Sequence, residues 1–293
     1  MSKFNNNTTG PASHFPMDAA GFLLNHDQVS IVVFRCYLKH RWSSPFMLRP
    51  LSLIVVALAF HASSLLRAET PPGFTSLFDG KTFSGWKVPE DDNGHWKILD
   101  GVIDYDASSE ARDDKNLWTE KEYGNFVLLV DWRIKETPYI NPRVPIVMPD
   151  GTHKLGADGE PIRTSVPDSD SGIFLRGEGK SQVNIWCWPI GSGEVYGYRM
   201  DKSMTPKVRA GVTPSTNADN NIGQWNTFEL TLHGDRLSVR LNGKQVLKNA
   251  QLPGIPSRGR IALQHHGGKD DDGNWKSPPA LVQFRNIAIK ELE

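Results

Sequence analysis

The stretch of sequence that decides the fold is residues 168–199, DSDSGIFLRGEGKSQVNIWCWPIGSGEVYGYR. Successive side chains of a β-strand point to opposite faces, so alternation of apolar and polar residues marks a strand with one buried face. Residues 171–176 and 182–188 both alternate in this way, and residues 177–181 between them are rich in glycine. The sequence therefore predicts two paired strands joined by a turn.

The two faces of these strands differ in chemistry. Val183, Ile185 and Cys187 share the apolar face of the second strand, and Ile173 and Leu175 match them in the first. The opposite face carries a different set, which comprises Phe174, Arg176, Gln182, Asn184, Trp186 and Trp188. One face is therefore expected to pack into the core, and the other to form a surface of amide, guanidinium and indole groups.

Such a surface suits a sugar. Amide and guanidinium groups supply planar donors and acceptors for hydroxyls, and the C–H face of a sugar ring packs flat on an indole. We therefore expect Gln182, Asn184, Trp186 and Trp188 to bind a saccharide. The alternative is that a loop covers the tryptophans, which then complete a second small core.

The rest of the chain also favours strands. Residues 96–103 predict a hairpin with Asp100-Gly101 at its turn, and residues 126–132, 225–233 and 281–289 alternate or run apolar. No long amphipathic helix is visible after residue 68. Many short strands separated by Gly, Asn and Asp turns predict an all-β, two-sheet sandwich.

Residues 137–167 interrupt this rhythm with six prolines and three glycines. We expect an inserted loop, with a small hairpin at Asp150-Gly151. Because a long loop in a compact domain is usually functional or disordered, and this one leads into residue 168, a lid over the site is one hypothesis. An insertion without a function is the other.

The N-terminal part has the layout of an export signal. A basic start at residues 47–50 precedes an apolar run at 51–60, and cleavage is expected after Ala68. Residues 47–68 are thus predicted to be a signal peptide, and residues 1–46 a non-native or disordered extension. The prediction is a single domain over 69–293, exported to the periplasm or secreted, without a stable membrane anchor.

Composition narrows the class of function. The formal net charge is zero, and a protein that binds nucleic acid usually carries a basic patch. Nine tryptophans favour contact with carbohydrate. Cys187 would be the one cysteine left after cleavage. Its position on the apolar face of its strand predicts a small buried side chain.

Five segments occur in an order that resembles a known family: SLFDGKTFSGW at 76–86, DSGIFLRG at 170–177, QWNTFELTLHGDRLSVRLNGKQV at 224–246, GRIALQHHG at 259–267 and VQFRNIAIKEL at 282–292. Together they resemble the 3-keto-disaccharide hydrolases. The resemblance implies a concanavalin-like jelly roll and the cleavage of glycosides oxidised at carbon 3. Where this family often has Glu-x-Gln-Ile-x-Asp, the chain reads Gln182, Asn184 and Cys187 at the three polar positions, which leaves activity and any divalent metal open.

Cleavage of such a substrate needs a base, an acid and a group that holds an enolate oxygen. His266 is expected as base or acid, because it shares a face with Gln264 rather than with the apolar positions of its strand. The alternatives are a surface histidine with its hydrogen bonds satisfied and a residue that positions a catalytic group. Arg176 is the candidate cation, with a structural ion pair as the alternative. Glu194 and Asp170 are the two candidate carboxylates, and the alternative for Asp170 is that it caps the turn before its strand. Asp170, Tyr198 and Gln264 complete the predicted substrate contacts.

Two further hypotheses stay open at this stage. The first is a carbohydrate-binding module of the same fold without catalysis, which the missing Glu at position 182 favours. The second is a protein-interaction domain, in which the tryptophans would form a contact patch. No metal ligands and no cofactor are assigned from the sequence.

Overall fold

The structure is a computed structural model of the chain and describes residues 69–293. The predictions for residues 1–46 and for the signal peptide at 47–68 lie outside the described residues.

The strands of residues 69–293 are β1 (Thr75–Ser76), β2 (Trp86–Lys87), β3 (Trp96–Leu99), β4 (Val102–Tyr105), β5 (Leu117–Tyr123), β6 (Phe126–Ile134), β7 (Tyr139–Pro145), β8 (Arg163–Asp168), β9 (Ser171–Leu175), β10 (Glu178–Ile185), β11 (Asn226–His233), β12 (Arg236–Leu241), β13 (Lys244–Gln251), β14 (Gly259–Leu263) and β15 (Val282–Glu291). The two helices of the same residues are short, α1 (Tyr196–Met200) and α2 (Pro206–Gly211). Neither is long or apolar enough to cross a membrane.

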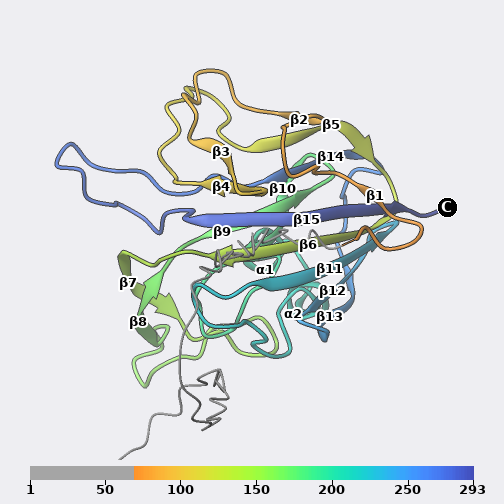
Figure 1. Cartoon of the computed structure of the whole chain (residues 1–293). Helices are drawn as coiled ribbons and strands as arrows, with labels where there is room; N and C mark the ends of the chain where they lie inside the picture. Colours follow the sequence, from red (N-terminus) through yellow and green to blue (C-terminus); the bar gives the residue numbers. More distant parts are fainter. Residues whose placement is uncertain (1–68) are drawn as a thin grey trace, which may run out of the picture. The chain divides into compact units, whose positions relative to one another are not determined.

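Two antiparallel sheets stack on each other (Figure 1). The large sheet has the order β13-β12-β11-β6-β15-β4-β3, with β1 paired to β15, and the small sheet has the order β10-β9-β14-β5-β2. Buried side chains from both sheets form one core cluster between them, for example Phe228 of β11 and Ile173 of β9. The predicted all-β, two-sheet sandwich of the jelly-roll type is confirmed.

The alternation read from the sequence positions the core as expected. Every second residue of β6 is buried, from Phe126 to Ile134, and β11 repeats the pattern from Asn226 to Leu232. The predicted Asp100-Gly101 turn joins β3 to β4, and both of its residues have positive φ angles, 50° and 79°.

The deciding stretch folds as a hairpin, but its turn is tighter than predicted. Arg176 and Gly177 form the turn with φ angles of 53° and 71°, so β10 begins at Glu178 and ends at Ile185. The prediction of a turn over 177–181 and a strand over 182–188 was wrong at both ends. Trp186 and Trp188 consequently follow the strand, and strand alternation no longer fixes where they point.

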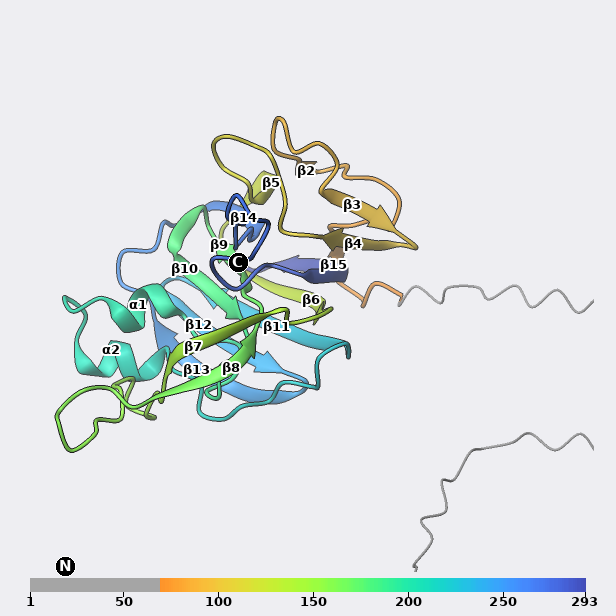
Figure 2. The same ribbon diagram turned by 90° about the vertical axis from the view of Figure 1, so that its left-hand side faces the viewer.

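Residues 137–167 are ordered rather than structureless. β7 and β8 pair as a third, two-stranded sheet, and the tip beyond them adds the bridges Val147–His153 and Leu155–Pro161. Figure 2 shows this hairpin beside α1 and α2, and the Nη1 atom of Arg199 in α1 lies 3.0 Å from Nε2 of His153. The predicted loop is thus a hairpin that packs on the helices.

Candidate active site on the outward face of the small sheet

The outward face of the small sheet is built around a glycine. Ile173 of β9 and Val183 of β10 point into the core, so Gly172 and Gln182 lie on the opposite face. A Cβ atom at Gly172 would lie 2.7 Å from Cγ of Gln182. Because the glycine leaves this space open, the Gln182 side chain crosses it, donates to the carbonyl of Ser171 at 3.2 Å and forms a short hydrogen bond with Gln264.

Asp170 and His266 lie at the end of this face, directly before β9 and after β14. Both side chains are half-buried. The carboxylate of Asp170 accepts no hydrogen bond from any side chain or backbone group in residues 69–293. Burial raises the pKa of Asp170 to about 7, the nearby His266 opposes this shift, and Asp168 adds to it.

The contacts of His266 leave one ring nitrogen available. Its Nδ1 lies 2.6 Å from the carbonyl oxygen of Pro278, which can only accept, so Nδ1 carries the proton. Within the described part of the chain Nε2 has no hydrogen-bond partner. A half-buried carboxylate with a pKa near neutrality, close enough to a histidine with a free nitrogen for that histidine to lower the pKa, is an arrangement suited to proton transfer.

His265 has a different environment from its neighbour. Its Nδ1 atom lies 2.5 Å from the hydroxyl of Tyr105, which stacks on Trp96 at 3.8 Å. Burial lowers the pKa of His265 to about 4, so this ring is neutral. The predicted assignment of His266, rather than His265, to the open face agrees with these positions.

Asn184 of β10 lies on the same outward face and pairs with Gly172 of β9 in the ladder. It is 3% exposed, and its Oδ1 atom has no hydrogen-bond partner within residues 69–293. Asn184, Gln182, Gln264, Asp170 and His266 are therefore the predicted site residues that the structure brings together.

Arg176 lies apart from them. It is 2% exposed, and its guanidinium donates to the carbonyls of Gly124, Gly234 and Pro256 and to Oδ1 of Asn125, at 2.7 to 3.1 Å. These contacts tie three loops to the β9–β10 turn. The predicted contact of Arg176 with a ketone oxygen does not fit this position, and neither does the alternative of an ion pair, because all four partners are uncharged.

Glu194 also does not lie on the outward face of the small sheet. Its side chain and that of Arg199 are fully buried and form a short ion pair. Burial raises the pKa of Glu194, and the contact with Arg199 partly offsets this effect. A carboxylate in this position binds an internal cation rather than a substrate.

The two tryptophans of the predicted sugar platform stack on each other. Their ring centroids are 4.1 Å apart with an angle of 3° between the planes, and Trp186 is only 3% exposed. The indole N–H of Trp186 donates to Gly191 O at 2.8 Å, and that of Trp188 donates to Asp168 at 3.2 Å. Tyr198, which the sequence predicts as a substrate contact, is buried, and its hydroxyl donates to the carbonyl oxygen of Pro253 at 3.3 Å.

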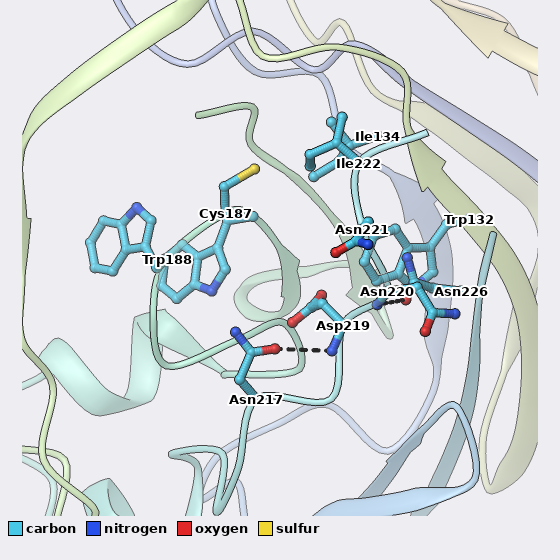
Figure 3. A pocket seen from close by; sticks show the side chains of 11 residues that line it. Trp132, Ile134, Cys187, Trp188, Asn217, Asp219, Asn220, Asn221, Ile222 and Asn226 are labelled. Atoms are coloured by element: carbon cyan, nitrogen blue, oxygen red, sulfur yellow. Dashed lines mark hydrogen bonds between the residues drawn. The ribbon is translucent and has the colours of Figure 1, made fainter. Parts of the chain in front are cut away.

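The stacked pair lines a pocket of about 280 Å³ at the end of β10 (Figure 3). Its other walls come from Trp132 of β6 and from residues 217–226. The sequence analysis did not identify these walls, since Trp132 alternates like any core residue and residues 200–221 are polar and lack the alternation of a strand. Among residues 69–293 no group of three His, Cys, Asp or Glu side chains is close enough to hold a metal ion.

A known protein family matches most of the described region. The 3-keto-alpha-glucoside-1,2-lyase-like domain matches residues 73–290, nearly the whole of the described region. The chain belongs to this family.

One curated relative is a 3-keto-disaccharide hydrolase from Bacteroides thetaiotaomicron, 32% identical over 121 residues. The match covers 38% of this chain and 40% of the relative, so it spans less than half of that protein.

Similar solved structures include a protein from Parabacteroides distasonis classified as a glycosyl hydrolase, with 20% identity and a TM-score of 0.47 over 76% of this chain and 85% of that one. A carbohydrate-binding module from Bacillus subtilis has 11% identity and a TM-score of 0.34 over 71% and 96% of the two chains.

Proposed function

We propose that the protein cleaves 3-keto-glycosides by elimination followed by hydration, on the outward face of the small sheet. The observation that carries the proposal is the half-buried carboxylate of Asp170, which accepts no hydrogen bond within residues 69–293, whose pKa burial raises to about 7, and whose charge is influenced by the nearby His266. Membership of the 3-keto-alpha-glucoside-1,2-lyase-like family supports the class of substrate.

The chemistry follows from the ketone at carbon 3, which acidifies the proton on carbon 2. A base removes that proton, the electron pair forms a double bond between carbons 1 and 2, and the glycosidic oxygen leaves carbon 1 with a proton from an acid. Water then adds its oxygen to carbon 1 and a proton to carbon 2. The products are 3-keto-glucose, or its counterpart, and the free alcohol.

Two side chains have the properties that these proton transfers need. Asp170 is unbonded and would be about half ionised near pH 7, so it can take the proton from carbon 2. His266, with Nδ1 held by Pro278, can exchange a proton at Nε2 with the leaving oxygen or with water. The base role therefore falls to Asp170 instead of Glu194.

The amide groups around Gly172 suit the hydroxyls of the sugar. Oδ1 of Asn184 is a buried acceptor without a partner among the described residues, and leaving such a group unpaired costs about 1–3 kcal/mol. A substrate hydroxyl would satisfy it. Gln182 and Gln264 hold each other in place beside it. We also propose export of the protein by the predicted signal at residues 47–68.

A turnover assay in heavy water tests the proposal. The protein is incubated with 3-keto-trehalose in D₂O, and release of 3-keto-glucose with deuterium at carbon 2 is expected, because hydration takes that hydrogen from solvent. Trehalose itself should not react. Asp170→Asn should lower the rate roughly 100- to 10,000-fold, while Asp113→Asn, at an exposed carboxylate, should leave it unchanged. Cleavage without deuterium at carbon 2 would contradict the elimination route.

The second candidate is a carbohydrate-binding module without activity. The observation in its favour is the amide of Gln182, where the resemblance leads us to expect a carboxylate. Saturable binding of 3-keto-trehalose with no product in the same assay would support this function over the first.

A further inference from the structure

The pocket at the end of β10 is separate from the outward face and holds unsatisfied polar groups of its own. Trp132, Trp188 and Asp219 line it, with Asn217, Asn226 and Ile222 (Figure 3). Ile222 is 48% exposed, so the pocket reaches solvent at that side chain. None of the residues Asp170, Gln182, Gln264 and His266 is part of its lining.

One donor and one acceptor in this lining are buried without a partner. Within residues 69–293 neither Nε1 of Trp132 nor Oδ1 of Asp219 makes a hydrogen bond. The other carboxylate oxygen of Asp219 is engaged, since it accepts from the backbone N–H of Ser192 at 2.8 Å. Because buried polar groups are nearly always paired in native proteins, a donor and an acceptor left open in one pocket indicate a ligand or ordered water.

The walls around these groups are held in place. Oδ1 of Asn217 accepts from the backbone of Asp219 at 2.9 Å, and Oδ1 of Asn226 accepts from the backbone of Asn220 at 2.8 Å and from Asn242 at 2.7 Å. The ring of Trp188 is fixed by its stack on Trp186. The pocket is thus formed before a ligand arrives, which reduces the entropy lost on binding.

The size of the pocket and the chemistry of its lining restrict the kind of ligand that it can bind. The volume of about 280 Å³ is near the lower end of small-molecule sites, roughly 300 Å³, and so fits one ring rather than a chain. A hydroxyl can accept from Trp132 and donate to Asp219 at once. The carboxylate of Asp219 disfavours an anionic ligand. Burial raises the pKa of Asp219, and the same burial disfavours a charged ligand in the pocket.

We propose that this pocket binds one neutral saccharide ring, with a hydroxyl between Nε1 of Trp132 and Oδ1 of Asp219. The asparagines of the lining present further amide groups, and Trp188 presents an aromatic ring to the C–H face of the sugar. The proposal does not depend on the proposed cleavage, since the pocket would bind even if Asp170 and His266 performed no chemistry.

Indole ¹⁵N NMR tests the site directly. The tryptophans are labelled with ¹⁵N, methyl α-glucoside is the probe, and Trp132→Phe identifies the Nε1–H signal of Trp132. We expect this signal to move in a saturable way, and Asp219→Ala to weaken the affinity about tenfold, the equivalent of about 1.4 kcal/mol for one hydrogen bond. Asp219→Asn, which keeps an acceptor at Oδ1, should restore part of the affinity.

Two controls keep this test separate from the test of cleavage. Trp118→Phe changes a tryptophan on the outward face, bonded there to Asp114, and should leave the affinity unchanged. Asp170→Asn should bind the glucoside as the wild type does even though turnover is lost. A Trp132 signal that does not move, or equal affinity in wild type and Asp219→Ala, would overturn the pocket proposal. Neither result bears on the cleavage reaction.

Discussion

Replacement of Glu194 by alanine should lower the stability of the protein, because Glu194 has a structural role rather than a catalytic one. Glu194 and Arg199 are both fully buried and paired. Alanine would leave the guanidinium of Arg199 with the imidazole of His153 at 3.0 Å, the sulfur of Met200 at 3.2 Å and the ring of Tyr196. None of these carries a compensating negative charge.

The expected loss follows from the burial of the remaining charge. Breaking a buried ion pair on one side typically costs about 3–5 kcal/mol. For a domain of this size, each kcal/mol lowers the melting temperature by about 2–4 °C, so Glu194→Ala should melt roughly 6–20 °C below wild type. Glu194→Gln, which keeps an acceptor for Arg199, should lose less.

Thermal denaturation followed by circular dichroism, with turnover measured on the same protein preparations, checks this prediction. The double variant Glu194→Leu with Arg199→Met should recover most of the stability, because it leaves no charge unpaired. If Glu194→Ala instead retained its midpoint of denaturation and lost turnover, the structural role would be refuted and the carboxylate would belong to the chemistry.

Four further outcomes are expected. The kcat/KM of the wild type should rise with pH through about 7 as Asp170 ionises. Folding raises this pKa from its usual value of 3.8 to about 7, so the contribution of Asp170 to stability is greatest below pH 3.8 and is lost as the pH rises through 7. Asp170→Asn should therefore flatten the pH dependence of the melting temperature between these two pH values. Cys187, whose pKa burial raises to about 12, should react with iodoacetamide at pH 8 far more slowly in the native protein than in urea, and equal rates would contradict this. Gly172→Ala places a Cβ atom 2.8 Å from the carbonyl of Val183 and 2.7 Å from Cγ of Gln182, so it should lower both stability and affinity for the substrate, as melting and binding curves would reveal.

The sequence predicted the sheets well because their signal is local. Alternation over seven to nine residues in β6 and β11 is enough to say which side chains enter the core, and the Asp100-Gly101 dipeptide is enough to place a turn. The same reasoning put Gln182, Gln264 and His266 on one face. Gln182 lies within β10, whereas Gln264 and His266 follow the end of β14 at Leu263, so their agreement with the prediction does not depend on strand alternation alone.

The prediction failed where the chain leaves its strands. Trp186 and Trp188 lie beyond the end of β10, so alternation said nothing about them, and their mutual stacking depends on Gly191 and Asp168. Arg176 occupies the turn itself with a positive φ, which sends its side chain to loops distant in sequence. Proline content suggested a loop at 137–167, although edge strands accept proline wherever no ladder hydrogen bond is needed.

The exchange of a carboxylate for an amide at position 182 fits the environment of Asp170. Gln182 reaches the carbonyl of Ser171, the residue that follows Asp170, and joins Gln264. A glutamate there could not donate to either oxygen, and its charge would add to that of Asp168 in raising the pKa of Asp170. The amide instead closes a neutral hydrogen-bonded pair across Gly172 and leaves Asp170 as the carboxylate beside His266. The altered motif is therefore consistent with a site whose base is Asp170.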